Sequence, residues 1–181
     1  DYVVLIDGDL ILHTNFIEDH IKNATLGYFV QGSRVFLSEK QTKNAINRKN
    51  IYFSFFSPGL SNRKNSIHSF FLSKVFSNKK NNLNGIKSCN MAFYLKDCLK
   101  INGFNNEFEG WGREDSEFIV RLMNSGIKRK NIRFNAIQFH LYHEEHSRKS
   151  LVSNDLILSN SIKNNSQWCN DGLNSVEAYE S

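Results

Sequence analysis

Apolar residues along this chain occur in short runs that alternate between strand-like and helix-like spacing. The apolar, β-branched run over 3–6 predicts a buried strand, and a β-rich run over 28–37 predicts a second one. Two later runs, over 88–95 and 132–142, predict further strands. Because helical spacing separates several of these runs, the pattern favours a layered α/β fold over a sandwich or a helical bundle.

The predicted helices are bounded by residues that commonly cap helices. Thr14 is expected to cap a helix that Gly27 ends. The apolar face of this helix would consist of Phe16, Ile17, His20 and Ile21. Ser38 and Gln41 have the spacing of a capping box and should open a short helix. A third helix is expected over 114–124.

Length and composition indicate one globular unit with a tail. The chain has 181 residues, of which 40% are hydrophobic and 23% charged, so it is able to bury a core and is too apolar to be disordered. We expect residues 1–149 to form part of a catalytic domain and residues 150–181 to form a polar, partly helical tail. No apolar run approaches the roughly 18–20 residues of a membrane span. Cys89, Cys98 and Cys169 have unrelated spacings and are expected to be free thiols of a cytoplasmic protein.

The net charge of +5 is concentrated in the segment 40–87. This segment contains no Asp or Glu, and it carries ten basic residues together with several phenylalanines. Such a segment suits an anionic partner, either a sugar diphosphate, an anionic lipid surface or a nucleic-acid backbone. A solvated basic face over buried phenylalanines explains it equally well. The chain has no signature of an RNA- or DNA-binding module, so we expect no nucleic-acid partner.

The first candidate site is Asp7-Gly8-Asp9, directly after the first predicted strand. Two carboxylates one residue apart at the end of a buried strand repel each other unless a cation neutralises them. Carboxylate oxygens suit Mg²⁺ or Mn²⁺, particularly beside a phosphate-bearing substrate. Many Asp-x-Asp pairs simply belong to turns.

The second candidate site is the stretch from Gly110 to Glu117, Gly-Trp-Gly-Arg-Glu-Asp-Ser-Glu. Acidic residues in a first helical turn favour the helix dipole whatever the function. Two glycines around Trp111, however, indicate that the backbone passes close to another group. A tryptophan face is also a platform for a sugar ring, and one carboxylate here could act as a general base towards an acceptor hydroxyl.

The third candidate site holds three histidines, His140, His143 and His146, at the end of the last predicted strand. They could form a zinc site by themselves, but strand geometry would place His140 and His143 on opposite faces. One of them close to the Asp pair would instead supply a nitrogen ligand to its metal.

Together these three motifs resemble GT-A glycosyltransferases, and most closely bacterial family 2 enzymes that build lipopolysaccharide or capsule sugars. The C-terminal half also resembles β1,4-galactosyltransferases and polypeptide N-acetylgalactosaminyltransferases. The order and spacing of the motifs carry the resemblance, together with Asn90-Met-Ala-Phe and Asn102-Gly-Phe between them. The resemblance covers about residues 1 to 149. It implies a mixed sheet flanked by helices, a nucleotide-sugar donor, and a glycan or lipid-linked acceptor.

The resemblance also assigns roles to individual residues. Asp115 matches the catalytic base of the family. The residues expected to bind substrate are Trp111, Gly112, Glu114 and Asn90. The expected ligands of Mn²⁺ or Mg²⁺ are Asp7, Asp9, His143 and, as a second choice, His140, with His146-Ser-Arg148 as a further possibility. Arg113 stands where the family frequently has glycine.

The chain begins inside an apolar run, so we expect the nucleotide-binding part of the domain to precede Asp1 and the fragment alone to be inactive or poorly folded. The inverting transferase would act in the cytoplasm, at the inner membrane face if the basic segment 40–87 contacts lipid. Two rival interpretations are an aspartate-nucleophile phosphohydrolase, whose first motif resembles the residues around Asp7, and a non-catalytic carbohydrate-binding remnant of a transferase.

Overall fold

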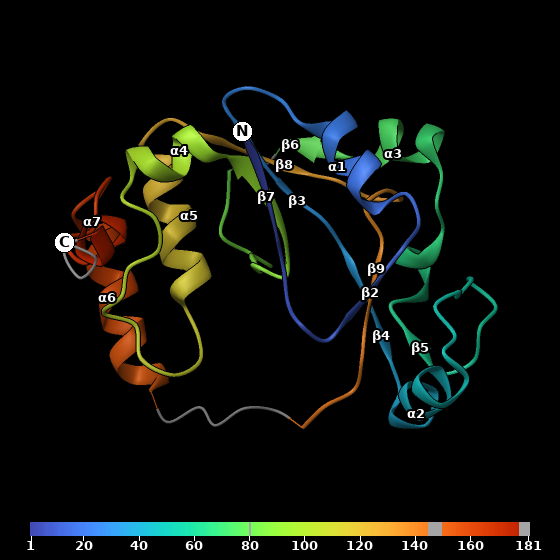
Figure 1. The fold of residues 1–181 in the computed structure, drawn as a ribbon. Helices are drawn as coiled ribbons and strands as arrows, with labels where there is room; N and C mark the ends of the chain where they lie inside the picture. The colour runs from blue at the N-terminus through green and yellow to red at the C-terminus, as the bar shows by residue number, and fades with distance from the viewer. Residues whose placement is uncertain (80, 145–149, 178–181) are drawn as a thin grey trace.

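Two mixed β-sheets flanked by helices form the core of the protein in the computed structural model, which describes residues 1–79, 81–144 and 150–177 (Figure 1). The first sheet contains, in spatial order, β1 (Tyr2–Ile6), β7 (Asn90–Tyr94), β3 (Tyr28–Gln31), β8 (Lys128–Asn131) and β6 (Asn78–Lys79). The second sheet contains β2 (Leu10–Leu12), β9 (Gln138–His140), β4 (Arg34–Leu37) and β5 (Leu60–Ser61). In each sheet one pair of strands is parallel, β3 with β8 and β4 with β9.

Three chain segments cross from the first sheet to the second. The chain passes from β1 to β2 through Asp7-Gly8-Asp9, from β3 to β4 through Gly32-Ser33, and from β8 to β9 through residues 132–137. The two sheets therefore meet along a line of crossings, and the predicted Asp pair lies on that line.

Helices cover both faces of the first sheet and one end of the second (Figure 1). The helices that precede β6 in the chain are α1 (Phe16–Asn23), α2 (Glu39–Arg48), η1 (Arg63–Ser66) and α3 (Phe70–Phe76). The remaining helices are α4 (Leu95–Lys100), α5 (Glu114–Asn124), α6 (Leu151–Lys163) and α7 (Leu173–Glu177). Helix α6 packs against α5, so part of the predicted tail contributes to the fold.

Three groups of buried apolar residues hold these layers together. The largest joins α4 and α5 to the first sheet, with Phe93 and Phe118 in ring contact at its centre. A second group lies on the opposite face of that sheet around Phe16 of α1. A third joins α2 to the second sheet around Phe139. Burial of such side chains is the main stabilising contribution to a fold of this kind.

Several sequence predictions are confirmed. The helix over 114–124 has the predicted bounds, and Ser38 opens α2 as predicted, its hydroxyl accepting a hydrogen bond from the backbone N–H of Gln41 at 3.3 Å. Only this half of the capping box forms, because the Ser38 N–H donates to the carbonyl of Gly59. The mixed sheets with flanking helices agree with the predicted fold class. All three cysteines are buried free thiols. In the described part of the chain no helix is both long and apolar enough to cross a bilayer.

Other predictions of local structure are wrong. The strand predicted over 28–37 is interrupted at Gly32-Ser33, where the chain changes sheets. The strand predicted over 132–142 is confined to Gln138–His140, because residues 132–137 form the crossing between the sheets. Helix α1 has Asn15 rather than Thr14 at its N-cap, and it ends before Gly27. Its buried face is formed by Phe16, Asp19 and His20, whereas Ile17 and Ile21 are exposed. The carboxylate of Asp19 binds the backbone N–H of Ala136 at 2.8 Å, and this contact fixes which face of α1 turns inward.

Candidate functional site

All three predicted sites converge on one cavity of about 1220 Å³ at the line where the sheets meet. The predicted residues that line this cavity are Asp7, Asp9, Trp111, Gly112, Glu114, Asp115, His140 and His143. They come from the first crossing, from the start of α5 and from the end of β9. Residues far apart in the sequence therefore face one space.

Strand pairing in the second sheet places the histidines beside Asp9. Leu10 pairs with His140 in the β2–β9 register, and the N–H of Leu141 donates to the backbone carbonyl of Asp9 at 3.0 Å. The Asp9 Oδ2 atom lies 3.0 Å from the Nε2 of His143 and 3.4 Å from the Nε2 of His140. The prediction that these histidines point to opposite sides is wrong, because β9 ends at His140 and the alternation of a strand does not continue to His143.

The two imidazoles are held in the tautomer that a metal ligand needs. His140 Nδ1 lies 2.8 Å from the carbonyl oxygen of Leu141, and His143 Nδ1 lies 2.7 Å from that of Glu144. A carbonyl oxygen only accepts hydrogen bonds, so each Nδ1 donates to it, and in a neutral ring the Nε2 lone pair would then face the Asp9 carboxylate, where a cation would hold the two together. This is the arrangement in which a backbone group orients a metal-ligating histidine.

Asp9, His140 and His143 fit a divalent cation. One ligand atom from each lies within 4.8 Å of the other two, and the Oδ1 atom of Asp9 is buried without a hydrogen-bond partner. One carboxylate and two imidazoles form a ligand set that suits Mn²⁺ and similar ions. Burial lowers the pKa of His140 and so favours the neutral ring that binds metal, even though the Asp9 carboxylate opposes this shift.

Asp7 lines the same cavity without joining the three-residue group. Desolvation raises the pKa of its carboxyl, and the neighbouring Asp9 carboxylate raises it further. The positive charges of Arg34 and of the histidines when protonated act in the opposite direction. The remaining candidates for the metal site, His146 and Arg148, lie outside the described residues.

The stretch from Gly110 to Arg113 approaches α6 closely. A Cβ atom on Gly110 would lie 3.0 Å from the Ser150 hydroxyl, and one on Gly112 would lie 3.2 Å from a Leu151 methyl group. Both glycines have a positive φ, as has Arg113 at φ 80°, ψ −15°. The glycines are therefore explained by close packing and backbone conformation, and Trp111, which is 46% exposed, is left facing the cavity.

Asp115 and Glu114 occupy the first turn of α5. Asp115 accepts hydrogen bonds from the backbone N–H of Ser88 and the hydroxyl of Ser116, both at 3.2 Å. Burial, and secondarily the Glu114 carboxylate, raise the pKa of Asp115, which makes its carboxylate a stronger base. Glu114 lines the cavity, and its Oε2 atom is buried without a hydrogen-bond partner in the described structure, so it has acceptor capacity that no protein group uses.

Asn90 lies away from this group. Its amide donates to the carbonyls of Ser33 at 2.8 Å and Ala136 at 2.9 Å, and its Oδ1 lies 2.9 Å from His20 Nε2. Burial lowers the pKa of His20 to about 4, so the neutral ring donates this hydrogen bond. These contacts tie α1 to two of the sheet crossings, and they give Asn90 a structural role. Substrate binding by Asn90 stays a prediction that its hydrogen bonds do not favour.

Sequence reasoning missed the basic residues of the cavity. Arg34 and Lys87 both line it, together with the aromatic ring of Phe36. Lys87 ends the basic segment 40–87, but no local signal in the sequence singles out Arg34, whose position follows from the β3–β4 crossing.

Comparison with known proteins agrees with this geometry. Residues 70–146 match the family model described as the N-terminal domain of galactosyltransferase. This part of the chain is galactosyltransferase-like. The matched range contains Trp111, Asp115 and both histidines of the cavity, whereas Asp9 lies outside it. The two mixed sheets with flanking helices are consistent with a GT-A-like galactosyltransferase domain.

A shorter match concerns one curated protein. Over 33 residues the chain is 48% identical to xylosylprotein 4-beta-galactosyltransferase of Caenorhabditis elegans. The alignment covers 18% of this chain and 11% of that protein, so the chain corresponds to a small part of the length of that relative. The galactosyltransferase-like region thus suggests a hexosyltransferase.

Proposed function

We propose that the chain carries the metal and acceptor machinery of an inverting glycosyltransferase that moves a sugar from a nucleotide-sugar donor to a glycan or glycolipid acceptor. The observation that carries this proposal is the convergence of Asp9, His140 and His143 with Glu114 and Asp115 on one cavity. Metal ligands and a buried carboxylate in the same cavity are the parts that a single-displacement transfer requires.

Each group has a distinct task in the proposed reaction. Asp115 accepts the proton of the acceptor hydroxyl while that oxygen attacks the anomeric carbon and the bond to the diphosphate breaks. Glu114 holds a second acceptor hydroxyl, and Trp111 presents its exposed face to the sugar. Asp9, His140 and His143 would hold Mn²⁺, the ion typical of galactosyltransferases, and the ion when bound offsets the charge that develops on the leaving diphosphate.

The metal site is tested by counting bound Mn²⁺ with electron paramagnetic resonance in the full-length protein. We expect one bound ion, and we expect Asp9→Asn to weaken binding at least tenfold. Asp7→Asn should weaken it less, because Asp7 is outside the three-residue group. The control Glu39→Gln removes an exposed carboxylate of α2 and should leave binding unchanged. Equal binding by wild type and Asp9→Asn would exclude this site.

The reaction is tested with the same proteins. Mn²⁺-dependent transfer from, or hydrolysis of, a nucleotide sugar should be lost in Asp9→Asn and in Asp115→Asn. Trapping of a phosphorylated Asp7 together with phosphatase turnover would instead establish the aspartate-nucleophile phosphohydrolase. Sugar binding without turnover and without metal dependence would establish a carbohydrate-binding remnant.

The proposal includes a peripheral contact with an anionic membrane through the segment 40–87. Large apolar side chains of this segment are exposed, among them Tyr52 at 71%, Phe56 at 85% and Phe71 at 73%. Exposed aromatics beside basic residues suit an anionic lipid surface, which supports the inner membrane face as the location. Surface polysaccharide as the product rests on the family resemblance alone. Co-flotation with phosphatidylglycerol vesicles, lost in the double substitution Phe56→Ser and Phe71→Ser, tests this contact. Unchanged flotation of that variant would refute it.

A further inference from the structure

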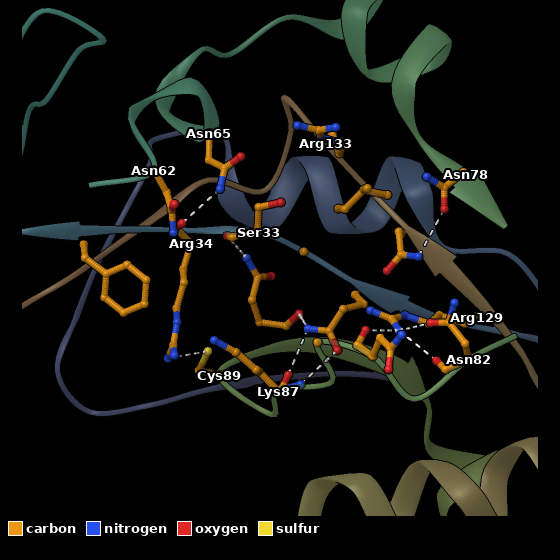
Figure 2. A pocket seen from close by; sticks show the side chains of 18 residues that line it. Ser33, Arg34, Asn62, Asn65, Asn78, Asn82, Lys87, Cys89, Arg129 and Arg133 are labelled. Atoms are coloured by element: carbon orange, nitrogen blue, oxygen red, sulfur yellow. Dashed lines mark hydrogen bonds between the residues drawn. The ribbon is translucent and has the colours of Figure 1, made fainter. Parts of the chain in front are cut away.

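A second cavity, of about 540 Å³, lies beside the proposed transfer site (Figure 2). Its walls come from the β3–β4 crossing, from the segment 62–65, from the loop after β6 and from the end of β8. It shares Arg34, Phe36, Lys87 and Cys89 with the first cavity, so the two spaces adjoin at these residues. Neither Asp9 nor either histidine lines it.

The lining of this cavity is basic and rich in amides. It includes four basic residues and seven asparagines, and among the described residues that line it none is acidic. The basic residues are Arg34, Lys87, Arg129 and Arg133. Basic groups that are withdrawn from water are normally paired with carboxylates. No carboxylate belongs to this wall, which leaves room for an anion supplied from outside, although Asp7 and Asp115 of the first cavity act electrostatically on Arg34 and Lys87.

Two of these cations converge on one aromatic ring. The guanidinium carbon of Arg34 lies 4.5 Å from the centroid of Phe36, and the ammonium nitrogen of Lys87 lies 5.9 Å from it. The Nε of Arg34 is buried without a hydrogen-bond partner, and an Nη atom lies 3.6 Å from the Cys89 sulfur, a weak acceptor. Desolvation, and then the charge of Arg34, lower the pKa of Lys87. An anion between these groups would relieve their repulsion.

The opposite wall is held in place by Arg129, which is 4% exposed. Its Nη1 atom donates to the carbonyls of Asn82 and Asn84, both at 2.8 Å, and so fixes the loop after β6 against β8. Its Nε is buried without a partner. The wall is therefore shaped before any ligand arrives, which lowers the entropic cost of binding.

The chemistry of the lining indicates a charged sugar. Asparagine amides both donate and accept hydrogen bonds and therefore match sugar hydroxyls, whereas the arginines match a carboxylate, sulfate or phosphate. The volume lies within the range of roughly 300–1,000 Å³ that is usual for small-ligand sites. Five of the seven asparagines already bond to protein groups, so a sugar would use the hydrogen-bonding positions that remain on their amides; these five are Asn65, Asn78, Asn82, Asn90 and Asn131.

We propose that this cavity binds an acidic sugar residue of the acceptor, carrying a carboxylate, sulfate or phosphate, next to the sugar that receives the transferred group. The proposal rests on the proposed function, because it extends the acceptor side of the same site. The donor diphosphate belongs with Asp9 and the histidines, which face the first cavity only. Arg34 and Lys87 mark the boundary that an acceptor chain would cross.

Calorimetric binding without metal or donor tests this site independently of turnover. The probes are methyl β-D-glucuronide, methyl β-D-glucoside, and the 6-sulfate and 6-phosphate of the latter. At least one charged glycoside should bind ten times more tightly than the neutral glucoside, and the best one identifies the anionic group. Arg34→Gln and Lys87→Gln should each remove most of that tenfold preference and leave binding of the neutral glucoside unchanged. Lys128→Gln, an exposed residue of β8 outside the lining, is the matched control.

Three results would overturn the proposal. The first is equal affinity for the charged and neutral glycosides. The second is competition by inorganic phosphate or sulfate at the same concentration as the charged glycoside, which would indicate a simple anion site. The third is competition by a nucleoside diphosphate, weakened in Arg34→Gln, which would assign these cations to the donor. If the wild-type protein showed no metal-dependent transfer but bound the charged glycoside, the proposed function would be refuted and this binding site would stand. The failure of one proposal is therefore distinguishable from the failure of the other. A thermal melt of each variant verifies folding.

Discussion

Replacing Asp115 by Asn should make the protein more stable at pH 7 and strongly slow transfer. Burial, with a further contribution from Glu114, raises the pKa of Asp115 above its value in the unfolded chain. The folded state therefore holds more protons than the unfolded state between these two pKa values, and stability falls as the pH rises through that interval. At pH 7 the ionised carboxylate costs about 1.4 kcal/mol for each unit by which its pKa is raised.

The amide introduced by Asp115→Asn would keep an oxygen that accepts the hydrogen bonds from Ser88 and Ser116, which stand at 3.2 Å in the wild type. The variant should therefore be more stable than wild type at pH 7, and the gain should shrink as the pH is lowered into the range where the wild-type carboxyl becomes protonated. Transfer should fall about 10²–10⁴-fold, the usual contribution of a general base. Urea denaturation at pH 7 and in that lower range measures the first effect, and nucleotide-sugar turnover measures the second.

A matched control tests whether the stability change in Asp115→Asn comes from burial of the carboxylate or from its position in the first turn of a helix. Glu39→Gln also removes a carboxylate from the first turn of a helix, but this carboxylate is exposed and paired with Lys43. That variant should lose up to about 1 kcal/mol. If Asp115→Asn were likewise less stable than wild type at pH 7, the carboxylate would be favoured by its surroundings. Burial would then not explain its basicity, and the assignment of Asp115 as the base would lose its physical support.

Three further predictions concern the supports of the site. Arg121 is fully buried and pairs with Glu117 at 2.7 Å, so Arg121→Met should cost about 3–5 kcal/mol in urea denaturation, and a loss below about 1 kcal/mol would contradict this. Gly32→Ala would place a Cβ atom closer to the Asn90 amide oxygen than van der Waals contact allows, and should lower stability by about 2 kcal/mol or more in thermal melts. In the control Gly8→Ala the added Cβ atom meets nothing within 4 Å, so the stability should change little. Arg113 has a left-handed backbone, so Arg113→Gly should be more stable than Arg113→Ala by about 1 kcal/mol, and the reverse order would show that the backbone is unstrained.

Local patterns in the sequence predicted the elements whose ends are marked by their own residues. The bounds of α5 and the Ser38 cap of α2 follow from capping residues and apolar spacing, and both are confirmed. The strand before Asp7 is confirmed for the same reason. The convergence of the Asp, Trp and His motifs on one cavity was expected from the family resemblance rather than from these patterns.

The errors arise where tertiary contacts override local spacing. A β-rich run over 28–37 gives no sign that its two halves join different sheets, except for the small residues Gly32 and Ser33. Helix α1 turns its polar Asp19 inward because that carboxylate binds the turn before β9, a contact with a residue more than a hundred positions away. The placement of His143 beside Asp9 depends on where β9 ends, which no periodicity specifies.

The seam between the two sheets has a consequence for turnover. Asp115 is carried by α5, which packs on the first sheet, whereas His140 ends a strand of the second. The separation of the proton acceptor from the ion ligands therefore depends on how the two sheets are joined, and three short segments join the first sheet to the second: residues 7–9, 32–33 and 132–137. Substitutions at Gly32 or Ser33, which carry no reactive group, should for this reason slow the chemical step by misaligning its two halves.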